Sequence, residues 1–358
     1  MVFEVCFIVY WNLFLQDRKQ FVSAGEIKSQ VKSVGFGYPQ GSVLGPLLFL
    51  IYIDDLRNAI NGLSFDLKCR DTGASKSILP YFADDTHLTV AAKTGEMLIQ
   101  NLQTGMLNIE KWMRVNKLQL NHAKSHFVMY GRSSNYYPWI EKIQLGENIL
   151  PREVSTKYLG VIVDECLNFK EHISCVSGKV ARNVGMMRKL KHFFPKDIMR
   201  LLYFSFVHPY LLYGCLVWSS TFLIHLRPLR SLQNNALRVL TGDNHNMSVR
   251  HRYNQVNILP MAGLFRFYNA FFMFKYTHAL LPECFREMFT SGVNFHNYST
   301  RASTLVRRPQ VIIKRSVFSI RHVGPRVWEP LTQAISTIDE LNEFRSKLKG
   351  QCLSAYEF

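Results

Sequence analysis

Apolar and polar positions in the first part of the chain, to about residue 165, follow both strand-like and helix-like spacings. The segment 20–36, QFVSAGEIKSQVKSVGF, alternates as a β-hairpin does. After Thr94, apolar residues recur every three or four positions, which predicts a helix with one buried face; they are Leu98, Leu102, Met106, Ile109 and Met113. Short strands are predicted at KLQLN (117–121), SHFVMYG (125–131), KIQL (142–145) and KYLGVIVD (157–164), with a turn at GEN (146–148).

The rest of the chain is predicted to be mostly helical. Between about 166 and 245, stretches with helical spacing end at Pro195 and at Gly242, residue types that commonly stop helices. The region 246–358 opens with an aromatic-rich helix, LFRFYNAFFMFKYTHALL (264–281). We expect its rings to form helix core rather than a platform for stacking bases. Three regions are therefore expected, 1–165, 166–245 and 246–358.

Two pairs of adjacent acids interrupt apolar runs. Asp84 and Asp85 lie in ILPYFADDTHLTV (78–90), where strand-like flanks predict a hairpin turn. Asp54 and Asp55 lie in PLLFLIYIDDLRN (46–58), where we expect a buried helix to end and the acids to be exposed. A hairpin turn holds carboxylates rigidly, as Mg²⁺ requires, although a polar turn without chemistry has the same pattern. As patterns the two pairs are nearly equal, and their context favours Asp84 and Asp85.

The charge balance narrows the partner class. The chain has 358 residues with 43 Lys and Arg against 26 Asp and Glu, a formal net charge of +17, which favours polyanions. Between 170 and 252 there are thirteen Lys and Arg but three acids, Glu171, Asp197 and Asp243. The stretch 301–328 has seven Lys and Arg and no acid, so it is either a solvated face or a phosphate-contacting one. No basic amphipathic helix stands out near either end, which favours nucleic acid over a membrane surface.

Cysteine and histidine spacing points to no metal or disulfide site. The seven cysteines are scattered and never spaced as C-x-x-C, so we expect reduced thiols in an intracellular protein, nuclear or cytoplasmic. The apolar start MVFEVCFIVYWNLFL has no basic segment, carries Glu4 and is too short to span a bilayer. We expect it to be core, and we expect no membrane segment.

An ordered series of motifs resembles a known family. GYPQGSVLGPLLFLIYIDDL (37–56), followed by FADDTHL (82–88), is similar to the palm of reverse transcriptases from non-LTR (LINE-type, jockey-like) retrotransposons. The resemblance spans about Gln16 to Lys349. It continues through NKLQLNHAKSHFVMYG (116–131), KYLGVIVDECLNFKEHI (157–173), HPYLLYGCLVW (208–218), HNYSTR (296–301) and GPRVW (324–328). Such a series is far more specific than an acid pair alone.

The resemblance implies an α+β fold and a polymerase function. The fold would be a partial polymerase palm at 1–165, an antiparallel sheet with helices on one face. An all-helical thumb would follow at 166–245, then a basic C-terminal region at 246–358. The implied activity is RNA-directed DNA polymerisation, with an RNA template, a DNA primer or target, deoxynucleotides and Mg²⁺.

The resemblance also implies site residues. Asp84 would be the main magnesium ligand and Asp85 its acidic neighbour. The nucleotide and template would contact Gln40, Gly41 and Ser42. At Gly41 the absence of a Cβ would let the backbone approach them closely. Lys124 would lie near the triphosphate, although it could equally be a solvated lysine. Tyr158, Leu159 and Gly160 would form the hairpin that grips the primer end, whereas Asp54 and Asp55 would not be catalytic.

The sequence departs from the family at its start. The family's palm begins with a strand whose Asp, in an AFD-like block, is the first metal ligand. Only fifteen residues precede Gln16 here, and their one acid is Glu4. The fingers and the N-terminal endonuclease of these elements also have no counterpart. We therefore expect a C-terminal part of a polymerase that is incomplete for two-metal catalysis. The alternative is a non-catalytic nucleic-acid-binding remnant.

Overall fold

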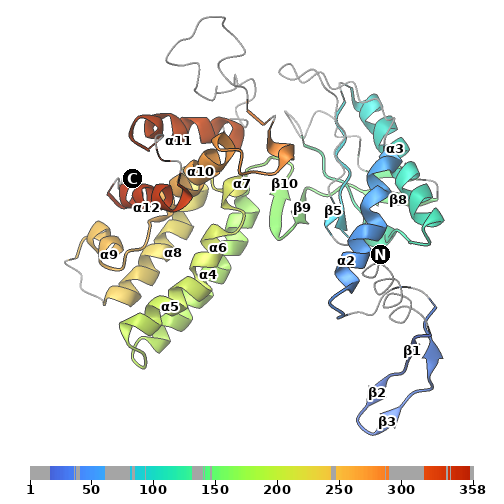
Figure 1. Cartoon of the computed structure of the whole chain (residues 1–358), viewed down its shortest axis with the longest axis horizontal. Helices are drawn as coiled ribbons and strands as arrows, with labels where there is room; N and C mark the ends of the chain where they lie inside the picture. The colour runs from blue at the N-terminus through green and yellow to red at the C-terminus, as the bar shows by residue number, and fades with distance from the viewer. Residues whose placement is uncertain are drawn as a thin grey trace, which may run out of the picture. The chain divides into compact units, whose positions relative to one another are not determined.

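The structure, a computed structural model, has an α+β architecture built from helices and small antiparallel hairpins (Figure 1). It describes residues 17–35, 37, 41–60, 81–82, 85–92, 94–130, 140, 142–145, 147–242, 247–286, 288–289, 318–335, 338 and 340–354. The chain divides into two compact units. The first unit comprises 1–126 and 139–151, and the second comprises 127–138 and 152–358.

The first unit opens with the hairpin that sequence alternation predicts. β1 (Lys19–Gln20) pairs antiparallel with β4 (Lys32–Ser33), and β2 (Ser23–Ala24) pairs with β3 (Ile27–Lys28). Ala24 is opposite Ile27, so Gly25 and Glu26 form a two-residue loop. Gly25 has a φ of 64°, a conformation that glycine adopts without a steric penalty. The hairpin predicted from the alternating pattern is confirmed.

Helices build a small core in the first unit. α2 (Gly45–Ile53) runs into η1 (Asp54–Ile60), a 3₁₀ helix, and α3 (Gly95–Val115) packs against η1. α3 begins where its sequence predicts, because the hydroxyl of Thr94 accepts a hydrogen bond from the Met97 N–H at 3.3 Å. The core consists of Ile53, Leu56, Ile109 and Met113.

The prediction that α2 is buried is wrong for most of its length. Ile53 is buried, but Leu47, Leu50, Ile51 and Tyr52 are 52%, 47%, 65% and 45% exposed. A helix that is apolar on all sides carries no polar face, so its sequence cannot indicate which side packs. The side that packs is set by α3 and η1, which lie elsewhere in the sequence.

The expected antiparallel sheet differs from the strands found. The described strands form separate two-stranded sheets: β5 (Tyr81–Phe82) with β6 (Asp85–Thr86), β7 (Lys142–Leu145) with β8 (Asn148–Pro151), and β9 (Ser155–Tyr158) with β10 (Val161–Asp164). KIQL is confirmed as β7, and the turn expected at GEN connects it to β8, while KYLGVIVD forms most of the β9–β10 hairpin.

Two of the predicted strands are not formed as expected. The prediction for KLQLN is wrong, because Lys117 has a φ of 55° and Leu118 and Leu120 pack against the helical core. SHFVMYG makes a single bridge, from Phe127 to Arg152. A short strand forms only where a partner strand is available, and neither segment carries that information in its own sequence.

The second unit is mainly helical. Its helices are α4 (Lys170–Leu190), α5 (Lys196–Phe206), α6 (His208–Leu212), α7 (Cys215–Trp218), α8 (Leu223–Thr241), α9 (Val249–Gln255), α10 (Met261–Thr277), η4 (Glu283–Phe285), α11 (Ile320–Ile335) and α12 (Leu341–Ser354). α4 packs along α8 and α5, as Figure 1 shows. α8 ends at Gly242, which has a φ of 88°, so the predicted helix stop is confirmed.

One hydrophobic core runs through the second unit. Its largest fully buried side chains include Trp218, Tyr203, Tyr253, Phe274 and Phe344. The aromatic helix predicted near residue 264 is α10, and its Phe265, Phe267 and Phe274 are buried, which confirms their assignment to the core. Within the described part of the chain, no helix is long and apolar enough to cross a membrane.

Candidate functional site

The acid pair lies at a β-hairpin. Tyr81 is opposite Thr86 and Phe82 is opposite Asp85, so residues 83 and 84 form the connection between β5 and β6. The strands predicted on both sides of the acid pair are confirmed. Asp84 itself lies outside the described residues, and Asp85 begins the returning strand with its side chain exposed.

Leu88 attaches this hairpin to the core of the first unit. Three residues after Asp85, its side chain packs against the cluster of Ile53, Leu56, Ile109 and Met113. Leu118 and Leu120 pack against the same cluster from the segment that follows α3. The acid hairpin and the segment leading to Lys124 are therefore held by one small core.

His87 is a neighbour of Asp85 that the sequence analysis missed. Burial lowers its pKa from 6.5, the carboxylate of Asp85 opposes that shift, and His126 adds to it. The pKa of His87 therefore responds to the charges of Asp85 and of His126. Residue spacing could not indicate that His126 affects His87, because the two histidines lie far apart in the sequence.

Lys124 lies at a capped 3₁₀ turn, η2 (His122–Lys124). The side-chain carbonyl of Asn121 accepts a hydrogen bond from the Lys124 N–H at 3.3 Å, and the Ser125 hydroxyl donates to the Asn121 carbonyl at 2.9 Å. These bonds fix the backbone, and the Lys124 side chain is exposed. Such a side chain is available to a phosphate, and it also fits a solvated lysine.

Gly41 and Ser42 precede α2, and Gln40 lies outside the described residues. Gly41 has a φ of 80°, and nothing lies within 4 Å of the position that a Cβ would occupy. Glycine therefore allows the backbone conformation at this position, and the space beside its Cα is open. The Ser42 hydroxyl accepts a hydrogen bond from the Gly45 N–H at 3.0 Å, which stabilises the start of α2.

The other acid pair ends a helix, as predicted. Asp54 and Asp55 begin η1, and both are exposed. The Asp54 carboxylate forms a salt bridge with Arg57 on the next turn. This pair is therefore engaged in local helix structure.

The second unit carries Tyr158, Leu159 and Gly160 at the β9–β10 turn. Tyr158 is opposite Val161, and Leu159 and Gly160 have φ values of 45° and 84°, as a two-residue hairpin loop of the I′ kind requires. The Tyr213 hydroxyl donates to the Leu159 carbonyl. A Cβ on Gly160 would lie 3.2 Å from Cε1 of Tyr213. Tyr213 therefore packs directly against this turn, which sequence reasoning did not foresee.

Further contacts fix the β9–β10 hairpin to the helices. Nδ1 of the buried His172 accepts a hydrogen bond from the Ile162 N–H at 3.2 Å. Burial lowers the pKa of His172, and the charge of Lys179 lowers it further. The Asp164 carboxylate accepts hydrogen bonds from the N–H groups of Cys166, Asn168 and Phe169. The hairpin is thus a rigid extension of the helical unit.

The donor set at the acid hairpin has the chemistry that Mg²⁺ prefers. Mg²⁺ is commonly held by one or two carboxylates, with water and substrate phosphates completing its octahedron. Asp85 supplies one exposed carboxylate. Within the residues that the structure describes, no three or more His, Cys, Asp or Glu side chains are arranged to hold a metal by themselves.

Comparisons with known proteins agree on one family. Residues 3–163 match the family model described as reverse transcriptase (RNA-dependent DNA polymerase). The chain is 26% identical over 233 residues to the probable RNA-directed DNA polymerase from transposon X-element of Drosophila melanogaster. It is 26% identical over 234 residues to the RNA-directed DNA polymerase from mobile element jockey of the same organism. Each alignment covers 64% of this chain and 24% of the relative, so the chain spans about a quarter of these relatives' length.

Proposed function

We propose that this chain, whose residues 3–163 match the reverse transcriptase family and which is similar to RNA-directed DNA polymerases of mobile elements, uses its two hairpins as polymerase-site elements. The β5–β6 hairpin would present Asp84 and Asp85 to the nucleotide, and the β9–β10 turn would hold the primer end. The pairing of Phe82 with Asp85 carries the proposal, because it makes Asp85 the first residue of the returning strand of a hairpin.

The residues of the first unit would share the binding of the incoming nucleotide. Asp84 and Asp85 would hold Mg²⁺, which when bound would neutralise charge on the triphosphate. Gln40, Gly41 and Ser42 would contact the nucleotide and template, and the exposed ammonium of Lys124 would contact the triphosphate. The anchoring of Leu88, Leu118 and Leu120 on one core supports this assignment, because it ties both segments to the same small scaffold.

The helical unit would act as a thumb that contacts the nucleic-acid backbone. Its excess of Lys and Arg between 170 and 252 supports such a contact, since phosphate neutralisation supplies most non-specific affinity. Its partners would be an RNA template, a DNA primer or target, and deoxynucleotides. The basic stretch 301–328, described only from residue 318, would extend this surface.

For the chain of 358 residues by itself, we expect nucleic-acid binding without polymerisation. Catalysis requires the primer hydroxyl, the nucleotide and two metal ions to be held together. The resemblance implies a first Asp block in addition to Asp84 and Asp85, and no segment of the printed sequence matches that block. The second candidate function, a non-catalytic nucleic-acid-binding module, shares this expectation.

Primer extension on an RNA template tests the proposal directly. The unmodified protein is compared with Asp84→Asn/Asp85→Asn and with the matched control Asp54→Asn/Asp55→Asn, which changes the other acid pair. We expect no extension by any of the three. Extension by the unmodified protein and the control, lost in Asp84→Asn/Asp85→Asn, would refute incompleteness and assign the acid hairpin to catalysis. Extension that survives in Asp84→Asn/Asp85→Asn would refute the role of the hairpin.

The role of the acid hairpin in metal binding has its own measurement. Mn²⁺, a paramagnetic substitute for Mg²⁺, broadens NMR signals of the groups close to it. In the presence of deoxynucleotide, we expect it to broaden the amide signals of Asp85 and His87 in the unmodified protein and in Asp54→Asn/Asp55→Asn. The broadening should be absent in Asp84→Asn/Asp85→Asn. Equal broadening in all three proteins would leave the hairpin without a metal-binding role.

A further inference from the structure

The turn between α4 and α5 places two adjacent aromatic rings at the surface of the second unit. Phe193 is 78% exposed and Phe194 is 44% exposed. Their N–H groups donate to the Leu190 carbonyl at 2.9 Å and 3.3 Å, so the backbone of the turn is fixed. Burial in the hydrophobic core therefore does not account for either ring.

Cations lie close to these rings in the sequence. The segment KLKHFFPK (189–196) places Lys189, Lys191 and Lys196 within a few residues of the two phenylalanines. The acid nearest to this segment in the sequence is Asp197, and no ion pair of the described residues joins it to Lys196 or Arg200. The turn is thus aromatic and positively charged at once.

Arg200, one turn into α5, is held in a fixed orientation. Its Nε donates to the Val256 carbonyl at 3.2 Å, and its guanidinium carbon lies 4.8 Å from the ring centroid of Phe204. Both contacts leave the two Nη groups without a hydrogen-bond partner among the described residues. A guanidinium held in this way offers a preorganised fork for the oxygens of a phosphate.

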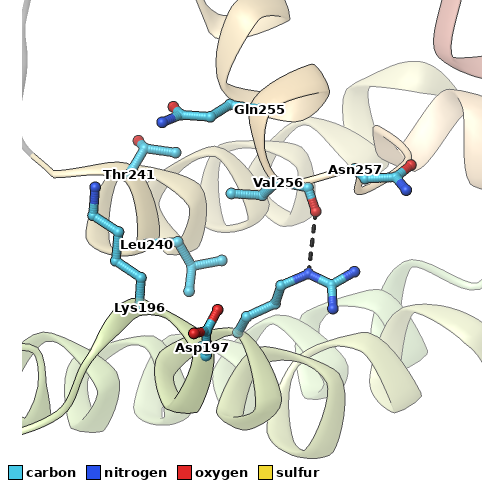
Figure 2. A pocket seen from close by; sticks show the side chains of 8 residues that line it. Lys196, Asp197, Leu240, Thr241, Gln255, Val256 and Asn257 are labelled. Carbon is cyan, nitrogen blue, oxygen red and sulfur yellow. Dashed lines mark hydrogen bonds between the residues drawn. The ribbon is translucent and has the colours of Figure 1, made fainter.

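An open pocket of about 340 Å³ lies at the start of α5, directly after the turn in the sequence. Lys196 and Arg200 of α5 line one side, Leu240 and Thr241 of α8 another, and the carboxamides of Gln255 and Asn257 a third. Figure 2 shows Lys196 extending from α5 toward Thr241, with Gln255 beyond it and Asp197 at the base. The volume is at the lower end for small-ligand sites, and the polar groups include both cations and amides that can bond a base edge.

We propose that this turn and pocket bind an unpaired segment of a nucleic-acid strand. Phe193 and Phe194 stack on bases, and Arg200 with Lys196 binds an adjacent phosphate. Phe194 is two residues from Lys196, so their Cα atoms are at most about 7 Å apart and one nucleotide can contact both. The inference rests on the proposed function, and it adds that single strands are bound at a site distinct from the two hairpins.

Stacking distinguishes single strands from duplex. In a duplex the base faces are covered by neighbouring base pairs, whereas in a single strand they are free to stack on an aromatic side chain. Exposed rings beside cations therefore add affinity for single strands above what charge alone gives. An anionic membrane surface would also attract this turn, but it would make no use of the amide-lined pocket.

Fluorescence anisotropy with labelled oligothymidylate and a duplex of equal length tests the proposal. We expect Phe193→Ala/Phe194→Ala to weaken single-strand binding by at least about tenfold, since the loss of a single stacked base already costs about that much. Its duplex affinity should change by less than about twofold, because no base face is accessible there. Leu223→Ala, at a side chain that is 79% exposed on α8, is the matched control and should change neither.

The cationic half of the site has a separate readout. Arg200→Ala should weaken single-strand binding and reduce the slope of log affinity against log salt by about 0.7, the contribution of one phosphate. Lys32→Ala, which removes an exposed cation of β4 in the first unit, should leave that slope unchanged. Far-UV circular dichroism checks that each variant folds. We expect folding to be retained, because the substituted side chains are exposed.

The outcomes separate this inference from the proposed function. If the unmodified protein binds no nucleic acid, the proposed function fails as well. If it binds but Phe193→Ala/Phe194→Ala binds single strands equally well, or loses single-strand and duplex affinity alike, only the inference is overturned. If Phe193→Ala/Phe194→Ala loses binding to phosphatidylserine vesicles but binds oligothymidylate as tightly as the unmodified protein, the inference is overturned in favour of a membrane contact.

Discussion

Gln233 is completely buried between the helices of the second unit and satisfies several polar groups at once. Its amide nitrogen donates to the Tyr203 hydroxyl and to the Leu259 carbonyl, each at 3.0 Å. Its amide oxygen accepts hydrogen bonds from the Tyr253 hydroxyl at 2.9 Å and from the Met261 N–H at 2.8 Å. A single side chain thus joins α5, α8, α9 and the start of α10.

Replacing this amide should therefore be costly. Gln233→Leu keeps the bulk of the side chain but leaves the Leu259 carbonyl and the Met261 N–H buried without partners. We expect the free energy of unfolding to fall by about 2–4 kcal/mol, from the penalty for unsatisfied buried groups. Urea unfolding followed by far-UV circular dichroism measures it. Ser231→Ala, at an exposed position on the same helix, is the control; equal stability of the two variants would contradict the role of the network.

Single residues also show why part of the candidate site was not predictable. Two adjacent acids between strand-like segments are recognisable in the sequence, so Asp84 and Asp85 can be selected as candidate metal ligands from it. Tyr213, by contrast, contacts Leu159 across 54 positions of chain. His172 contacts Ile162 through a ring nitrogen that accepts a hydrogen bond. Neither partner follows from spacing, because both depend on how helices fold back on the β9–β10 hairpin.

Among the elements, predictability follows the presence of a polar face and of end signals. α3 has both, an apolar face of fixed spacing and the cap Thr94, and it begins where predicted. α2 lacks a polar face, and its burial was predicted wrongly. The alternating segment 20–36 forms a hairpin whose loop contains Gly25, because its two halves can pair with each other. KLQLN also has a strand-like sequence, but it has no partner strand among the described residues and forms no strand. Local signals thus locate elements better than they indicate which elements pair.

The attachment of β10 to α4 should depend on pH. Because His172 accepts the Ile162 N–H through Nδ1, only the neutral ring can make this bond. Its pKa is lowered from 6.5 by burial, and by the charge of Lys179 to a lesser degree. The unfolded chain therefore takes up a proton more readily than the folded one. The stabilisation is fully present above pH 6.5 and is lost as the pH falls through the lowered pKa.

Amide hydrogen exchange measures this dependence locally. We expect protection of the Ile162 amide to fall on acidification below pH 6.5 more than the intrinsic exchange rate accounts for. His172→Asn supplies a side-chain oxygen as acceptor that does not titrate in this range, so its Ile162 amide should lose the extra pH dependence. The local probe matters because burial also lowers the pKa of His208 in the same unit. The same pH profile in the variant would contradict the assignment.

At the scale of the whole molecule, charge is the property most directly tied to function. The formal net charge of +17 is independent of fold, and it is concentrated in the sequence of the helical unit and beyond. Such a distribution attracts polyanions over distances longer than a contact, and salt screens it. The two units separate the proposed roles, because the acid hairpin belongs to one and the cation-rich helices to the other.

Binding of nucleic acid should therefore be strongly salt-dependent and largely independent of sequence. Each phosphate that the protein neutralises releases counterions, so log affinity should fall linearly with log salt. The slope should be about −0.9 per phosphate for duplex DNA and about −0.7 for single strands. Filter-binding titrations from low to physiological ionic strength measure it on two duplexes of unrelated sequence. Asp85→Asn is the matched charge variant: removing an acid near bound phosphates should leave affinity unchanged or slightly raise it, with the same slope. The opposite outcome is an affinity that is independent of salt or that differs strongly between the two duplexes. Either result would show that contacts other than phosphate neutralisation dominate, and it would contradict the role assigned to the cation-rich helices.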